Sequence, residues 1–292
     1  MGEVVRIVGS MLVRDDDLWV ERALRNVAGF CDRIHVLDHR SRDRTGEILR
    51  RLAGAWEHME VVRSSDARRS HRMLAPYVGT RTWVLPVDGD ELYDPAGLAR
   101  LRADLLAGAH ADAFRLRPWI VHCVALDEAA GTATGYLSPP SRVVGKLYNL
   151  AAVEAWPEGP ERLHGNPVFR EGFASSSVTE LYALHAWEDD PLRFLHLCFM
   201  PRSSSDPEPG GERRNLGETG AYRRGVLARA ARWARRPALS REYRDAAQRG
   251  VSWKRAKYAR GDLVTVDARP FLAGTGRAAV APVGGDPDRP PA

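Results

Sequence analysis

Apolar runs of strand length alternate with helical segments over the N-terminal part of the chain. The runs lie at 4–13, 33–38, 60–63 and 83–87, and between them apolar side chains recur at the spacing of an amphipathic helix. Repeated strand–helix–strand units place their strands side by side in a parallel sheet with helices over its faces. The alternation therefore predicts an α/β fold built on a doubly wound sheet.

The run at 83–87 ends abruptly in the acidic turn Asp88–Gly89–Asp90–Glu91. Open α/β sheets bind ligands at the carboxyl edge of their strands, where this turn would lie. Two carboxylates one residue apart, on a tight turn that Gly89 permits, can reach one hard divalent cation such as Mg²⁺ or Mn²⁺, which shares its other positions with substrate phosphates. The alternative is an acidic surface turn in which Asp90 or Asp94 caps the following helix.

Three strand ends carry polar motifs in an order that matches one enzyme family. The motifs are residues 11–15 after the first strand, residues 38–45 after the second and the acidic turn after the fourth. Together they resemble the motifs of family 2 glycosyltransferases of the GT-A fold, and the resemblance covers residues 4–110. The chain departs from that family at two places. Asp15–Asp16 stands where the family usually has Asn–Glu, and His39–Arg40 stands where it usually has Asn–Gly or Asp–Gly.

The resemblance implies a GT-A fold with a Rossmann-like mixed sheet and a role for each matching residue. Asp38 would accept a hydrogen bond from the base, with a turn-capping aspartate as the alternative. Asp90 would hold a Mn²⁺ or Mg²⁺ ion that bridges the two phosphates, and Asp88 would contact the ribose or the metal. Glu91 would orient the loop or touch the acceptor. The implied nucleotide-binding residues are Leu12, Val13, Arg14, Asp38, Arg69, Asp88 and Gly89.

The second part of the chain is expected to form the acceptor side. Strands are predicted at 113–121 and 146–150, and a loop rich in Gly, Thr, Ser and Pro at 127–142. A long, irregular, aromatic segment follows at 156–167, and loops of this kind usually carry substrate contacts. The candidate sugar or acceptor contacts are Lys146, Trp156 and His164, together with Glu91; for Trp156 the alternative is ordinary core packing.

Two later segments, 180–186 and 192–199, are predicted as strands joined by a tight turn. In such an antiparallel hairpin His185 and His196 would face the same side. A histidine late in the domain often completes the metal site of GT-A enzymes, and the resemblance gives this role to His196. The alternative for His196 is a core histidine that hydrogen-bonds the backbone.

The resemblance also implies a reaction. Family 2 members mostly invert the anomeric carbon in one displacement, in which a carboxylate deprotonates the acceptor hydroxyl. The candidate bases on the acceptor side are Glu180, Glu188 and Asp190, and each could instead be a surface acid. We therefore expect a metal-dependent transferase that moves a sugar from a nucleotide-diphosphate donor, a UDP-sugar, to a carbohydrate or small-molecule acceptor.

Charge and cysteine usage indicate an anionic ligand and a reducing compartment. The formal net charge is +5 and the pI is about 9.3, which suits a phosphorylated ligand. Because an Arg-, Ala-, Gly- and Pro-rich composition also follows from a GC-rich genome, we expect no nucleic-acid partner. Cys31, Cys123 and Cys198 lack the spacing of disulfide frameworks or zinc sites. With neither a long apolar run nor a signal-peptide pattern, the expected location is the cytoplasm.

The composition changes after residue 202. We expect a flexible lid at 203–220, an Arg-rich amphipathic helix at 221–260 and a disordered tail at 274–292. The helix suits either peripheral contact with an anionic membrane or packing on the core. The predicted parts are a nucleotide-sugar-binding half at 1–110, an acceptor-binding half at 111–202, a lid and helical extension at 203–273, and the tail.

Two other functions fit part of the pattern. A haloacid-dehalogenase-like phosphohydrolase also places D-x-D after an apolar strand, with a later lysine and paired acids, here Lys146 and Asp189–Asp190. That motif, however, normally ends the first strand of the core, whereas several strand–helix units precede Asp88. The third hypothesis is a nucleotide-sugar-binding module without chemistry, which would bind the donor and leave it intact.

Overall fold

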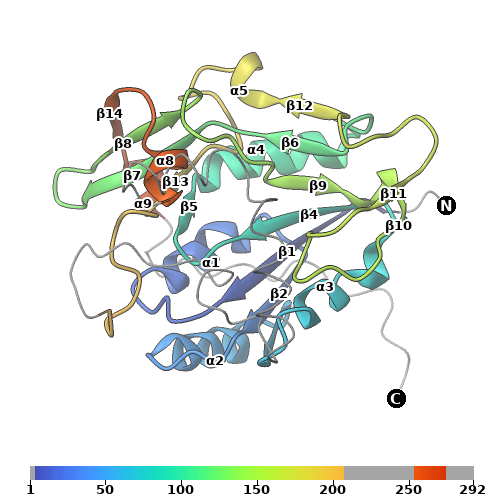
Figure 1. The fold of residues 1–292 in the computed structure, drawn as a ribbon, viewed down its shortest axis with the longest axis horizontal. Helices are drawn as coiled ribbons and strands as arrows, with labels where there is room; N and C mark the ends of the chain where they lie inside the picture. The colour runs from blue at the N-terminus through green and yellow to red at the C-terminus, as the bar shows by residue number, and fades with distance from the viewer. Residues whose placement is uncertain (1–3, 207–252, 274–292) are drawn as a thin grey trace, which may run out of the picture.

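The computed structural model describes residues 4–206 and 253–273 (Figure 1). In these residues one sheet contains β1 (Arg6–Val13), β2 (Arg33–Asp38), β3 (Met59–Arg63), β4 (Thr82–Val87), β6 (Arg115–Arg117), β9 (Leu147–Asn149) and β12 (Val178–Glu180). A second sheet contains β5 (Glu91–Tyr93), β7 (Ile120–Asp127), β8 (Thr132–Ser138), β13 (Phe194–His196) and β14 (Leu263–Asp267). A small ladder joins β10 (Val153–Ala155) and β11 (Val168–Phe169).

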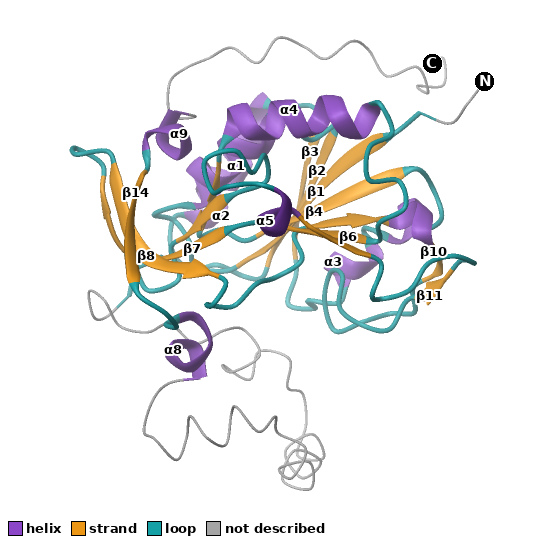
Figure 2. Cartoon of the chain, turned by 90° about the horizontal axis from the view of Figure 1, so that it is seen from above, coloured by secondary structure: helices purple, strands orange, loops and turns teal. Residues whose placement is uncertain are grey.

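Helices cover both faces of the first sheet. They are α1 (Val20–Ala28), α2 (Thr45–Ala55), α3 (Arg69–Arg72) and α4 (Pro95–Leu106), with the 3-10 turns η1 (Ala75–Tyr77) and η2 (Leu150–Ala152). Successive side chains of a strand point to opposite faces. Ile34 and Val36 of β2 accordingly belong to the core that includes Leu24 of α1, whereas Leu37 packs with Ala67 beside α3. Figure 2 shows α1 and α4 on one side of β1–β4 and α3 on the other.

The strand order reverses between β1 and β4. The chain runs outward from β1 to β2 and β3, which are parallel, and then crosses back to place β4 on the other side of β1, also parallel. Beyond β4 the sheet continues as β9, β6 and β12, of which β9 is antiparallel to both of its neighbours. The predicted α/β class with a doubly wound, Rossmann-like mixed sheet is thus confirmed. The reversal point is where such sheets bind ligands.

The acidic turn joins the two large sheets. β4 ends at Val87, and Glu91 already begins β5, so the chain changes sheets within the turn. In the second sheet β13 lies between β5, to which it is antiparallel, and β7, to which it is parallel. This pairing brings the second sheet against the carboxyl edge of the first, as Figure 1 shows for β4, β5 and β13.

Several local predictions were wrong. The segment 180–199 is no hairpin: β12 ends at Glu180, the helix α5 (Leu181–Leu184) follows, and β13 pairs with β5 and β7 instead. The predicted strand at 113–121 is two strands of different sheets, because Pro118 has no N–H with which to continue a ladder. The predicted loop at 127–142 contains β8, which pairs with β7 and β14.

The C-terminal part is described over a short range. It contains α8 (Trp253–Tyr258), β14 and α9 (Arg269–Leu272). The predicted tail lies outside the described residues, and so does most of the predicted lid and of the predicted basic helix. The membrane contact expected of that helix therefore falls outside them too, except for α8. Among the helices that the structure describes, none has the length and apolar character needed to cross a bilayer.

Candidate metal and nucleotide site

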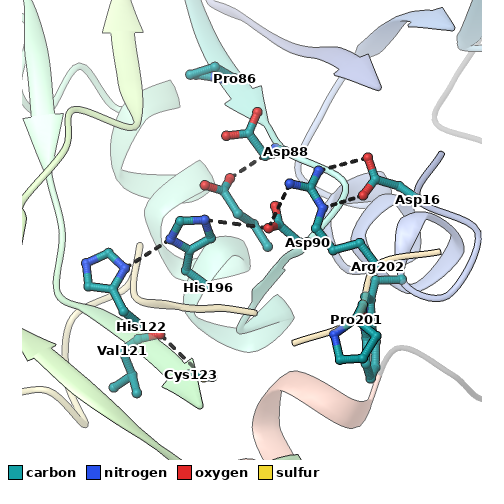
Figure 3. A network of polar contacts seen from close by, with 12 residues as sticks. Asp16, Pro86, Asp88, Asp90, Val121, His122, Cys123, His196, Pro201 and Arg202 are labelled. Atoms are coloured by element: carbon teal, nitrogen blue, oxygen red, sulfur yellow. Dashed lines mark hydrogen bonds and ion pairs between the residues drawn. The ribbon is translucent and has the colours of Figure 1, made fainter. Parts of the chain in front are cut away.

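The acidic turn and the loop after β1 meet at the reversal point. Figure 3 shows Asp16, from that loop, beside Asp88 and Asp90. A Cβ on Gly89 would lie 3.0 Å from both Cβ and Cγ of Asp16, which is tighter than side chains normally pack. The close approach of the two loops therefore requires glycine at this position.

Replacing Gly89 by Ala should lower the free energy of unfolding by about 1–3 kcal/mol, the usual cost of forcing an extra group into a packed site. Asp16 cannot move aside freely, since Arg202 and Thr45 hold it. Gly54→Ala in α2 is the matched control, because a Cβ there meets nothing within 4 Å and alanine favours the helix. Urea denaturation of both variants checks this, and equal stability for the two would contradict it.

Asp88 is held by two cations from the second half of the chain. Arg162 Nη1 lies 2.8 Å from its Oδ1, and Lys146 Nζ lies 3.6 Å from its Oδ2. Burial opposes ionisation of Asp88, but these two charges outweigh it and lower its pKa. The Arg162 loop is itself anchored on α3, where its backbone N–H donates to Ser70 Oγ at 2.9 Å. Asp88 is therefore a carboxylate in a prearranged cationic setting.

Glu91 lies beneath the turn and fixes its shape. It is 2% exposed, its Oε1 lies 2.5 Å from Lys146 Nζ, and its Oε2 accepts hydrogen bonds from Tyr93 Oη at 3.2 Å and from the Asp88 N–H at 3.1 Å. Burial raises the pKa of Glu91 to about 7. Burial opposes the charge of Lys146 too, yet Glu91 and Asp88 raise its pKa, so the ammonium stays charged. Both residues, predicted as acceptor contacts, thus brace the turn.

Asp90 has a buried carboxylate without a hydrogen bond among the described residues. It is 1% exposed, and both of its oxygens are enclosed. Its Oδ2 faces His196 Nε2 at 3.7 Å and Arg202 Nη1 at 3.2 Å. Burial opposes its ionisation, but the charge of Arg202 lowers its pKa. Buried polar groups are normally hydrogen-bonded, so these oxygens suit a ligand that is a cation.

His196 is brought to Asp90 by the register of β13. In this sheet His196 stands opposite Glu91 of β5 and His122 of β7. Burial lowers the pKa of His196 to about 4, so its ring is neutral and can ligate a metal. Asp90 and His196, with Asp88 close by, present the oxygen and imidazole donors that bind Mn²⁺, and the residues present fit that ion. His185, at the end of α5, has no place in this cluster.

Arg202 ties the site to the loop after β1. Its Nε and Nη2 bond the two oxygens of Asp16 at 2.5 Å and 2.8 Å, in the bidentate geometry that guanidinium favours (Figure 3). The next residues extend this contact, since Ser203 Oγ donates to Asp43 Oδ2 at 2.6 Å and Ser204 N–H donates to Asp17 Oδ1 at 2.7 Å. The described start of the predicted lid is therefore bound over the first two strand ends.

The predicted base-binding residues line the ends of β1 and β2. Asp38 is buried, accepts the Ser41 N–H at 2.7 Å, and lies 3.5 Å from Arg63 Nε. It therefore organises the turn after β2, as the capping alternative requires, and its role toward a base stays a prediction. Of the other predicted nucleotide contacts, Leu12 and Val13 are buried in β1, and Gly89 packs on Asp16. Nε of Arg14 lies 3.5 Å from Oδ2 of Asp15, and Arg69 is exposed on α3.

The other predicted acceptor contacts lie apart from the turn. Trp156 packs against Phe114, with ring centroids 6.0 Å apart, which is the core-packing alternative. His164 is largely exposed, and its Nδ1 lies 3.2 Å from Glu161. Neither side chain has a hydrogen bond or ion pair to Asp88, Asp90 or Glu91 among the described residues.

The three candidate bases have separate environments. Glu180 pairs with Arg117 at 3.0 Å at the end of β12, and Glu188 is exposed. Asp190 is fully buried and accepts the backbone N–H groups of Trp119 at 2.7 Å and Leu192 at 2.8 Å, and burial raises its pKa to about 6. None of the three bonds to the acidic turn within the described ranges, so their catalytic role stays a prediction.

Four residues of the site were not predicted from the sequence: Asp16, His122, Arg162 and Arg202. Asp16 lies in the loop between β1 and α1, which begins at Val20. Arg162 and Arg202 come from irregular segments, where no periodicity indicates direction. In the sequence, Arg162 is marked only by its place in the predicted substrate loop at 156–167, and Arg202 only by its place just after the strand predicted to hold His196.

Comparison with known proteins shows distant similarity to solved structures. No protein-family model and no curated protein matches the chain. A mannosyltransferase from Pyrobaculum calidifontis, solved with GDP-mannose and Mn²⁺, is 17% identical with a TM-score of 0.31, over 43% of this chain and 37% of that one. A mannose-6-phosphate isomerase from Helicobacter pylori is 8% identical, with a TM-score of 0.31 and coverage of 50% and 72%. A 4-diphosphocytidyl-2C-methyl-D-erythritol synthase from Anaerococcus prevotii is 11% identical, with a TM-score of 0.27 and coverage of 50% and 70%.

Proposed function

We propose that the chain is a metal-dependent glycosyltransferase that moves a sugar from a nucleotide-diphosphate donor, a UDP-sugar, to the hydroxyl of a carbohydrate or small-molecule acceptor, with inversion. The observation that carries the proposal is the buried Asp90 carboxylate, which accepts no hydrogen bond from the described residues and faces His196 Nε2 and Arg202 Nη1 at the point where the strand order reverses. A buried carboxylate beside a histidine nitrogen suits a metal cation. The carboxyl ends of the strands at a reversal of strand order are where open α/β sheets bind nucleotides.

Asp88, Asp90 and His196 would hold the Mn²⁺ or Mg²⁺ ion. When bound, the ion neutralises the charge that develops on the departing nucleoside diphosphate. The protein's own cations balance its own acids: Lys146 pairs with Glu91, Arg162 pairs with Asp88, and Arg202 pairs with both Asp16 and Asp90. The acids are therefore already placed, and Asp88 is already ionised, before the ion and the diphosphate arrive.

The nucleoside would occupy the crevice outside the ends of β1 and β2. Leu12 and Val13 end β1, Arg14 follows them, and Asp38 ends β2 opposite Val13 in the parallel register. The acceptor would approach from the side of the second sheet, with Glu180, Glu188 or Asp190 as the base that takes its proton. Lys146, Glu91, Trp156 and His164 are the proposed sugar and acceptor side.

A thermal-shift panel of UDP, GDP, dTDP and their sugars, with and without Mn²⁺, tests the proposal. Ligands that bind the folded state raise its stability by mass action, so a UDP-sugar with Mn²⁺ should raise the melting temperature most. Product analysis with the stabilising donor then separates the alternatives. Sugar transfer supports the proposal, phosphate release from a monoester indicates the phosphohydrolase, and donor binding without turnover indicates the binding module.

Asp38→Ala should raise the KM for the donor about 10- to 100-fold, because a hydrogen bond to a charged group contributes about 1.5–3 kcal/mol. The turn contact to Ser41 is lost at the same time, so the melting temperature of the variant must be measured alongside. Steady-state kinetics with varied donor give the answer. A folded variant with unchanged KM would show that Asp38 serves only the turn.

A further inference from the structure

A second histidine lies behind His196, on the side away from Asp90 (Figure 3). His122, in β7, is fully buried. Its Nδ1 lies 3.0 Å from Nδ1 of His196, and its Nε2 lies 2.9 Å from the carbonyl oxygen of Arg142. The groups form one line: the Arg142 carbonyl, His122, His196 and then the Asp90 carboxylate.

The carbonyl at one end of this line fixes every proton along it. A carbonyl oxygen only accepts, so Nε2 of His122 must carry the hydrogen. A neutral imidazole carries a single ring hydrogen, so Nδ1 of His122 is then an acceptor. The hydrogen between the two rings must therefore belong to Nδ1 of His196. In a neutral His196 ring, Nε2 is then without a hydrogen and faces the Asp90 carboxylate.

The other proton arrangements conflict with the surroundings. With the hydrogen on Nδ1 of His122, its Nε2 lone pair would face the Arg142 oxygen at 2.9 Å and repel it. A doubly protonated His122 would be a buried cation, and no carboxylate contacts it among the described residues. Besides His196, its neighbours are the Arg142 carbonyl and the ring of Tyr258 from α8, with ring centroids 4.6 Å apart. An uncompensated charge in such a place is costly.

We propose that His122 is a positioning residue that sets the tautomer of His196, so that Nε2 of His196 meets Asp90 as a bare ligand nitrogen. The distance is consistent with this tautomer: Nε2 of His196 and Oδ2 of Asp90 lie 3.7 Å apart, beyond hydrogen-bond length, as two acceptors would. The lone pairs of Nε2 and Oδ2 then face each other beside Arg202 Nη1, which lies 3.2 Å from Oδ2, and a metal ion between them would stabilise the arrangement further. The inference rests on the proposed metal site and adds the group that prepares it before the metal arrives.

Nitrogen NMR of the metal-free, full-length protein tests the tautomers directly. Long-range ¹H–¹⁵N spectra of protein labelled at histidine distinguish a ring protonated at Nδ1 from one protonated at Nε2. We expect the Nδ1–H form for His196 and the Nε2–H form for His122, each assigned by the loss of its signals in His196→Gln and His122→Phe. A His196 ring protonated at Nε2, or one that exchanges between both forms, would overturn the proposal.

Two variants of His122 connect the tautomer to metal binding. His122→Phe keeps a ring beside Tyr258 but removes the acceptor, whereas His122→Asn keeps an oxygen near the position of Nδ1. Loss of a group that orients a metal-binding histidine typically costs 10- to 100-fold in metal affinity, so His122→Phe should weaken Mn²⁺ binding by about that factor. His122→Asn should stay close to the wild type. Equal Mn²⁺ affinity in the wild type and His122→Phe, or an equal loss in both variants, would contradict the role.

Cys198→Ala provides the control for a different site. Ligand atoms of His122, His196 and Cys198 lie within 4.8 Å of one another and could hold a metal themselves. In our account their two Nδ1 atoms share a hydrogen, so Cys198→Ala should leave Mn²⁺ affinity unchanged. Metal binding that needs Cys198 but not Asp90 would overturn the proposal.

These measurements use Mn²⁺ alone, without donor or acceptor. Failure of the proposed function therefore looks different from failure of this inference. With the expected tautomer and Mn²⁺ affinities but no sugar transfer, the inference stands and the transferase fails. If sugar is transferred while His196 is protonated at Nε2, the transferase stands and the role of His122 fails.

Discussion

Asp90→Asn should reduce sugar transfer about 100-fold or more and remove the stabilisation that Mn²⁺ gives the wild-type protein. An ion that neutralises a leaving group contributes several kcal/mol to the transition state, and each 1.4 kcal/mol is a factor of ten in rate. Asparagine keeps the size of Asp90, and Arg202 keeps its bidentate contact with Asp16. The variant does lose the charge that faces Arg202 Nη1 at 3.2 Å, so its melting temperature without metal must be compared with that of the wild type.

Activity assays and melting curves, each over an Mn²⁺ titration, check this result. EDTA should abolish activity of the wild type, and added Mn²⁺ should restore it there but not in Asp90→Asn. Asp189→Asn, at an exposed acid, is the control and should behave as the wild type. Full activity of Asp90→Asn in EDTA would refute the metal-dependent mechanism.

Lys146→Met should lower the free energy of unfolding by about 3–5 kcal/mol, the usual cost of removing one partner from a buried ion pair. Lys146 is 5% exposed and Glu91 2%, and methionine leaves the Glu91 carboxylate without its cation. Asp88 loses part of its positive surroundings at the same time. Urea denaturation without metal measures the effect.

Two controls show whether burial of the pair is the cause. The double variant Lys146→Met with Glu91→Gln removes both charges, so it should recover part of the lost stability. Arg51→Met breaks an exposed pair with Glu21 and should change stability little. Additive losses in the double variant would show that Lys146 does not act through Glu91.

The strand ends of the first sheet could be predicted because their signals are local. Each apolar run and the helix after it are contiguous in sequence, so the alternation gives the parallel sheet and places Asp38 and Asp88 at its edge. The glycine between the two aspartates was expected to permit the turn, and the structure adds the reason that Asp16 packs against it. Local patterns therefore give this half of the site.

The other half depends on long-range packing. Nothing near His196 in sequence indicates that β13 lies between β5 and β7. The apolar pattern of this segment fits a hairpin with the preceding segment equally well. His122 could not be assigned to the site without that pairing. Arg162 reaches Asp88 only because Ser70 anchors an irregular loop on α3. Such contacts are fixed by tertiary structure and leave no periodic trace in the chain.

The most direct test of the central claim is a crystal of the protein with UDP and Mn²⁺, measured at a wavelength where manganese scatters anomalously. We predict an anomalous peak bound by Asp90 and His196, with Asp88 nearby and the diphosphate of UDP on the same ion. UDP bound at the ends of β1 and β2 with no manganese at Asp90, or manganese bound only at other residues, would contradict the account.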